Sequence, residues 1–130
     1  MNRIRLRCDD LGQGRKDGSF EIQVVTPKFT GAATFFGDVE DIEAFADRLS
    51  GYPLDPSNRP EFRADHVALR IEPSGGAGHL MLHLSLRDYY VGHDRLSVAI
   101  PATYAGLQEI QRLLREFIQS PFEQVEIDIH

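Results

Sequence analysis

Apolar and polar residues alternate strictly between residues 79 and 87, in the segment HLMLHLSLR. The apolar positions are Leu80, Leu82, Leu84 and Leu86. Alternate side chains lie on opposite faces of a β-strand, whereas on a helix these leucines would be scattered around the axis. The segment is therefore predicted to be a strand with one buried face.

The same period recurs in four further segments, which contain Ile4, Leu6 and Cys8; Phe20, Ile22 and Val24; Val67, Leu69 and Ile71; and Leu96, Val98 and Ile100. Two more stretches, TGAATFFG and VEIDIH, are candidate strands, the second at a sheet edge. PSGGAG and VGHD have the composition of hairpin turns, and DDLGQGRKDG that of a long hairpin loop. A shared buried face requires Leu69 to lie opposite Leu82 or Leu84.

Two stretches have helical spacing instead. In GDVEDIEAFADRLSGYP the apolar residues recur every three or four positions, and Asp38 is a good N-cap. In PATYAGLQEIQRLLREFIQSP an apolar stripe runs from Tyr104 to Ile118. The three prolines of YPLDPSNRPEFRAD predict a long loop over residues 51–65.

These elements predict an α+β fold, with an antiparallel sheet of five or six strands and two amphipathic helices packed on one face. We expect residues 1–130 to form a single α+β domain. The expected core includes Leu69, Leu82, Leu84, Val98, Ile22, Phe45, Ile110 and Phe117. His79, His83 and Arg87 are expected to lie off the core.

The amino-acid composition argues against several classes of function. The formal net charge of −6 argues against general nucleic-acid binding, which needs a basic surface. One cysteine cannot form an internal disulfide, and no apolar stretch approaches the ~20 residues that span a bilayer. We therefore expect a cytoplasmic protein with no nucleic-acid partner, no membrane partner and no cofactor.

His79 and His83 are the first residues to test as a metal or catalytic site. Four residues along a strand span ~13 Å, whereas ligands of one zinc ion lie within ~2.1 Å of it. The two histidines alone are therefore not expected to bind a metal. They are more simply explained as polar residues on the exposed face of a strand.

Other candidate catalytic residues have equally plain explanations. Cys8 shares its parity with Ile4 and Leu6, which favours a buried, unreactive thiol. Asp65 and His66 are adjacent and would point to opposite faces of a strand, and His93 and Asp94 fall in the predicted turn. We therefore expect no catalytic residues and no enzyme activity.

Two charged surfaces are candidates for binding a partner. The first predicted helix carries a cluster of acids, Asp38, Glu40, Asp41, Glu43 and Asp47. The polar face of the predicted sheet carries Arg3, Arg5, Arg7, Arg70, Arg87 and Arg95, together with His83 and other histidines. Arg70, His83 and Arg87 are the partner-binding candidates on this face, which could also form a homodimer.

The segments FRADHVALRIEPSGGAGHLMLHLSLRD and DRLSVAIPATYAGLQEIQRLLREFI resemble a group of small bacterial domains of unassigned function, and are similar to the WapI-like immunity proteins of polymorphic toxin systems. The shared pattern is a strand, a Gly-His turn, a long alternating strand ending in Leu-Arg, another strand and a closing helix. It covers roughly the C-terminal half. The tryptophans frequent in these families are absent here.

The resemblance implies a non-catalytic protein-binding domain that acts as an immunity-type inhibitor of a bacterial toxin. An acidic chain would suit capture of a basic toxin domain. The alternatives are a small enzyme that uses the histidines of the sheet and the 51–65 loop, and a homodimeric structural or assembly protein.

Overall fold

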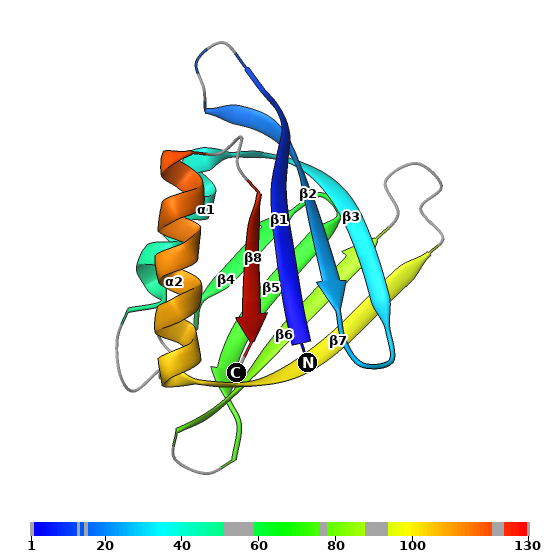
Figure 1. Ribbon diagram of the computed structural model, residues 1–130, viewed down its shortest axis with the longest axis vertical. Coiled ribbons are helices and arrows are strands. Elements are labelled where there is room, and N and C mark those ends of the chain that lie inside the picture. Colours follow the sequence, from blue (N-terminus) through cyan, green and yellow to red (C-terminus); the bar gives the residue numbers. More distant parts are fainter. Residues whose placement is uncertain are drawn as a thin grey trace.

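The computed structural model describes residues 2–12, 14, 16–50, 59–75, 78–87, 94–120 and 124–129, and it contains two four-stranded antiparallel sheets and two helices (Figure 1). The first sheet, sheet A, has the order β3-β2-β1-β8 and contains β1 (Asn2–Leu11), β2 (Asp17–Val25), β3 (Thr30–Asp38) and β8 (Val125–Ile129). The second sheet, sheet B, has the order β4-β5-β6-β7 and contains β4 (Glu61–Ala64), β5 (Val67–Pro73), β6 (His79–Arg87) and β7 (Arg95–Thr103).

The α+β class is confirmed, but the prediction of one sheet of five or six strands with both helices on one face is wrong. The alternating pattern identifies which face of each strand is buried and does not specify what covers that face. Here the apolar faces of the two sheets cover each other, as Figure 1 shows from the crossing of sheet A in front of sheet B. Strand β4 also lies within the stretch predicted to be a loop, where Phe62 and Ala64 alternate with charged residues.

The core lies between the sheets and is closed along one side by the helices α1 (Val39–Arg48) and α2 (Tyr104–Gln119) (Figure 1). The two helices contact each other, α2 also contacts β8, and α1 contacts β4. Ring contacts cross the core: Phe35 of sheet A packs edge-on against Phe62 of sheet B, with 5.5 Å between centroids. Of the eight expected core residues, six are buried, while Leu69 and Val98 are only partly buried.

Both helices begin where the sequence indicates. The side chain of Asp38 accepts a hydrogen bond from the Glu40 backbone N–H at 2.8 Å, which confirms Asp38 as the N-cap of α1. The hydroxyl of Thr103 caps α2 in the same way, from the Gly106 N–H at 3.0 Å. The Gln111 side chain of α2 donates to the Ala46 carbonyl at 2.8 Å and so joins the two helices.

The predicted strand pairing is confirmed where β5 meets β6, since Leu69 lies opposite Leu84. TGAATFFG forms β3, and the C-terminal stretch forms β8 at the edge of sheet A. The loop predicted over DDLGQGRKDG is shorter than expected, because β1 continues to Leu11 and β2 begins at Asp17. The predicted turn at VGHD falls mainly on residues outside those that the structure describes. Neither described helix is both long and apolar enough to span a membrane.

Replacing Leu82 tests the arrangement of the two sheets. Its side chain is 1% exposed and lines a small apolar gap between the sheets, so Leu82→Ala should lower the free energy of unfolding by ~2–5 kcal/mol. The adjacent His83 is on the outer face, and His83→Ala should cost less than ~1 kcal/mol. Urea denaturation measures both values, and equal midpoints would contradict this assignment of faces.

Candidate binding surface on the second sheet

The sequence placed six arginines on one polar face, but the structure divides them between the outer faces of two sheets. Arg3, Arg5 and Arg7 follow one another along β1, in the middle of sheet A, flanked by β2 and β8. Arg70, Arg87 and Arg95 belong to sheet B. The prediction of a single arginine-rich face is therefore wrong, and the two groups have different surroundings.

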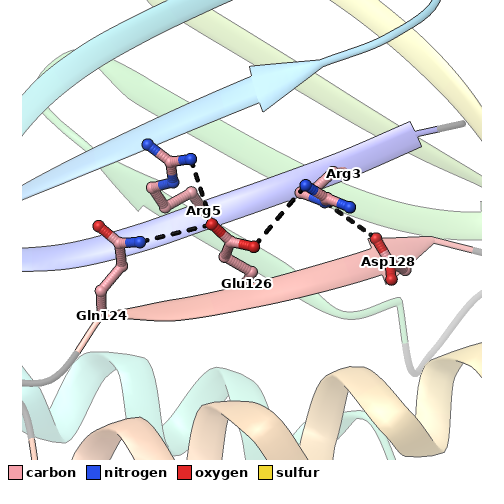
Figure 2. Close-up of polar contacts among 5 residues, drawn as sticks. All are labelled: Arg3, Arg5, Gln124, Glu126 and Asp128. Carbon is pink, nitrogen blue, oxygen red and sulfur yellow. Dashed lines mark hydrogen bonds and ion pairs between the residues drawn. The ribbon is translucent and has the colours of Figure 1, made fainter.

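The arginines of β1 are already paired with carboxylates, and Figure 2 shows the pairs made by Arg3 and Arg5. Arg3 Nε lies 3.0 Å from Asp128 Oδ1, and Arg5 Nη2 lies 3.1 Å from Glu126 Oε1. Arg7 contacts Asp9 at 2.7 Å and Glu21 at 3.2 Å. The hydrogen bond that Arg3 donates to Asp128 raises the pKa of Arg3, and the one that Arg7 donates to Asp9 raises the pKa of Arg7. This face is internally neutralised, so its charges favour no particular partner.

Three of the five acidic candidates on α1 also have structural contacts. Asp38 caps the helix, Glu40 lies 3.2 Å from Lys16, and Asp47 lies 3.2 Å from Arg115 of α2. Asp41 and Glu43 are exposed and form no ion pair with another described residue. The acidic surface predicted for a partner is thus reduced to two carboxylates.

The outer face of sheet B is hollowed along its middle. Arg63, Ala68, Ser85 and Ser97 occupy successive strands and form one cross-strand row. Two adjoining hollows, of about 330 and 300 Å³, share these four residues. Because the central side chains are small, the floor lies low between the longer side chains around it. We call this feature the arginine trough, and define it by Arg63, Arg70, Arg87 and Arg95 around the small residues Ala68, Ser85, Ser97 and Ala99.

The four arginines of the trough differ in how their charges are balanced. Arg63 pairs with Glu61, which raises the pKa of Arg63 through their hydrogen bond. Arg70 lies 3.8 Å from Glu72. Arg87 donates to the backbone carbonyl of Asp65 at 2.9 Å, and Arg95 has no ion pair within the described part of the chain.

Arg87 and Arg95 lie directly opposite each other on β6 and β7, and both are exposed. Like charges in this relation destabilise a sheet. Neither guanidinium forms an ion pair with a carboxylate among the described residues, in contrast to Arg3, Arg5 and Arg7. This end of the trough therefore has positive charge available for an anionic group.

Glu72 is the residue that the sequence analysis missed. His83 Nε2 lies 3.0 Å from its Oε1, and Arg59 lies 3.3 Å from its Oε2. Together with Arg70, three cationic or protonatable side chains surround one carboxylate. The even numbering of Glu72 and Arg70 indicates their shared face, but the approach of His83 depends on the register of β5 against β6.

The structure brings Arg70 and His83 together as cross-strand neighbours and places Arg87 on the same face. His79 lies on this face too, exposed at the start of β6. Among the described residues there is no group of three or more His, Cys, Asp or Glu side chains that could hold a metal ion. Cys8 is buried in the core, and this burial raises the pKa of its thiol.

Comparison with known proteins shows a similarity of fold to a solved structure. No protein-family model matches the chain, and no curated protein sequence matches it. Among solved structures, the chain is similar to the crystal structure of WHY1 from Arabidopsis thaliana, with a TM-score of 0.51 and 18% sequence identity. The match covers 90% of this chain and 76% of the WHY1 chain. At this identity the likeness shows the fold alone.

The likeness corrects one prediction. WHY1 is a single-stranded DNA-binding protein, so the exclusion of nucleic acid as a partner, drawn from the net charge, is wrong. A net charge averages over the whole surface, whereas the arginine trough is a local concentration of positive groups.

We expect the purified protein to retain no stoichiometric zinc after dialysis, measured by elemental analysis and by zinc titration. The reason is that His79 and His83 are ~13 Å apart along one strand, while His83 is engaged with Glu72. One equivalent of bound zinc that is lost in His83→Ala would contradict this expectation.

Proposed function

We propose that the protein is a non-catalytic protein-binding domain, an immunity-type inhibitor of a toxin, and that it binds its partner through the arginine trough. The resemblance of its C-terminal half to WapI-like immunity proteins supports the class of function. We choose this surface because Arg87 and Arg95 lie opposite each other, are exposed, and have no carboxylate partner among the described residues.

An uncompensated pair of like charges costs stability, and such local conflicts concentrate at functional sites. A carboxylate from a partner would offset the repulsion between the two guanidinium groups, because an arginine can bind both oxygens of a carboxylate at once. The low floor of Ala68, Ser85 and Ser97 leaves room for a projecting segment between the arginines. Arginine is enriched in the energetically important parts of protein interfaces.

The surface of the partner is therefore expected to be acidic where it meets the trough. A partner that bound the acids of α1 would instead need a basic surface. Of those acids, only Asp41 and Glu43 lack an assigned contact among the described residues. The two surfaces have opposite charge, so charge reversal distinguishes them.

A pair of double variants tests the proposal. Arg87→Glu with Arg95→Glu should weaken binding of the native partner at least ~10-fold, equivalent to about 1.4 kcal/mol, because both attractive contacts become repulsive. Asp41→Lys with Glu43→Lys, a change of the same size on α1, should leave binding unchanged. Affinity is measured after recovery of the partner from native lysate at low salt, and the wild-type complex should weaken as salt is raised.

If the α1 variant loses the partner and the trough variant keeps it, the acidic surface is the interface. The immunity-type role requires in addition that the recovered partner, or the product of a neighbouring toxin gene, is inhibited at a one-to-one ratio. Turnover in a general hydrolase screen, together with no protein partner, would support the enzyme alternative instead.

A second candidate function is binding of a single-stranded nucleic acid along the same trough. The four arginines and the fold likeness to WHY1, a single-stranded DNA-binding protein, favour it. Phe, Tyr and Trp side chains that stack on bases are common in such sites, and the described residues lining the two hollows include none of these three types.

Fluorescence anisotropy with labelled oligothymidylate decides between the two candidates. If the trough binds single strands, the affinity should fall steeply with salt and be lost in Arg87→Glu with Arg95→Glu. Saturable binding with both of these properties would support the nucleic-acid candidate, and its absence at physiological salt would leave the protein partner as the supported candidate.

A further inference from the structure

Strand β3 is an edge of sheet A, and within the described part of the chain it has none of the usual protection. It pairs with β2 over nine residues, and from Thr30 to Gly37 it contains no charged residue and no proline. Charges, proline and short length are the devices by which edge strands avoid pairing with other chains.

The other edges of the two sheets, as far as the structure describes them, are protected. Strand β4 has four residues and carries Glu61 and Arg63, and β7 contains Pro101. Strand β8 is contacted by α2. The open edge at β3 is therefore distinctive among the described strands.

The hairpin between β2 and β3 fixes which backbone groups point outward. The Thr26 N–H donates to the Phe29 carbonyl at 2.8 Å, so these residues are a hydrogen-bonded pair. Hydrogen-bonded and non-hydrogen-bonded pairs alternate along an antiparallel ladder. The register from Val25–Thr30 onward then directs the N–H and C=O groups of Thr30, Ala32 and Thr34 away from β2, toward the open edge.

A hollow of about 540 Å³ lies beside the first half of β3. It is lined by Glu21 and by Thr30 to Thr34 of sheet A, and on the other side by Leu86, Arg87, Asp94, Arg95 and Leu96. Gly31 packs so closely against Leu96 that an added Cβ would lie 2.4 Å from its Cδ2. Figure 1 shows β3 crossing in front of β6 and β7. Because Arg87 and Arg95 also line the arginine trough, the hollow continues that surface to the edge of sheet A.

The large exposed apolar side chains of the described residues lie on β3, just before it, and opposite its start on β2. They are Val25, Phe29 and Phe36, with 36%, 58% and 49% of their surface exposed. Phe36 belongs to β3, Phe29 immediately precedes it, and Val25 lies opposite Thr30. Exposed apolar groups next to unpaired backbone groups are the combination that an added strand uses.

We infer that β3 is a docking edge for an extended segment of a partner protein, which adds to sheet A as a fifth strand. Its backbone pairs with Thr30, Ala32 and Thr34, an apolar side chain lies beside Phe36, and an acidic side chain reaches Arg95. This inference rests on the proposed function, because both require a protein partner. It adds that the partner binds through an extended segment.

Proline at position 32 provides the sharpest test. The Ala32 N–H points outward, so Ala32→Pro removes a donor from the open edge and breaks no bond within sheet A, a position where edge strands tolerate proline. Ala32→Thr keeps the N–H and is the matched control. Peptides as long as β3 are selected from a displayed random library against the wild-type protein, and their affinities are measured for each variant.

We expect the selected peptides to bind Ala32→Pro about tenfold more weakly than wild type and to bind Ala32→Thr equally well, since the lost bond leaves a peptide carbonyl unpaired. Arg95→Glu should also weaken binding about tenfold, and the sequences should contain Asp or Glu. N-methylation of alternate peptide residues should abolish binding to the wild-type protein, a readout that holds even if Ala32→Pro does not fold.

Failure to select any peptide, or equal binding by Ala32→Pro, would overturn the inference. If that occurs while Arg87→Glu with Arg95→Glu still loses the native partner, the docking edge is wrong and the proposed function stands. Concentration-dependent dimerisation that Ala32→Pro abolishes would show that a second copy of the chain occupies the edge, and would likewise overturn the occupant inferred here.

Discussion

Burial of two apolar sheet faces against each other is the interaction on which the rest of the structure depends. Each sheet has one apolar face, and neither helix is wide enough to cover one alone. Packed together, the sheets place Ile4, Ile22 and Phe35 of sheet A opposite Phe62, Ile71 and Leu82 of sheet B. The helices then need to close only one side, and Phe45 of α1 and Phe117 of α2 reach the same aromatic cluster. The outer faces are left free for binding.

Local sequence determined the faces and ends of most elements, because these depend on periodicity and capping. The N-cap at Asp38 and the pairing of Leu69 with Leu84 could both be predicted in this way. The number of sheets could not, since a strand with one buried face has the same alternation whether a helix or a second sheet covers it. Strand β4 was missed for a different reason: prolines at 53, 56 and 60 precede it, and its four residues give a weak pattern.

The binding surface was predicted only in part. Arg70, His83 and Arg87 do share a face, as their parity within neighbouring strands indicates. Which carboxylate neutralises which arginine depends on the cross-strand register and on contacts between residues far apart in sequence. Arg3 is thus paired with Asp128, whereas Arg95 has no such partner in the described part of the chain. Arginines that look alike in the sequence are therefore neutralised on the outer face of sheet A, whereas on sheet B they form the arginine trough.

The pairing of β1 with β8 also affects how the chain can fold as it is synthesised. β1 emerges before the other described strands and lies in the interior of sheet A, with β2 on one side and β8 on the other. β2 and β3 can pair with it early through two hairpins, but its other edge stays open until residues 125–129 have been made. Contacts this distant in sequence close late and slow folding. Until β8 has been made, the nascent chain therefore exposes an unpaired strand edge that can aggregate, and a chaperone that shields such edges would favour correct folding.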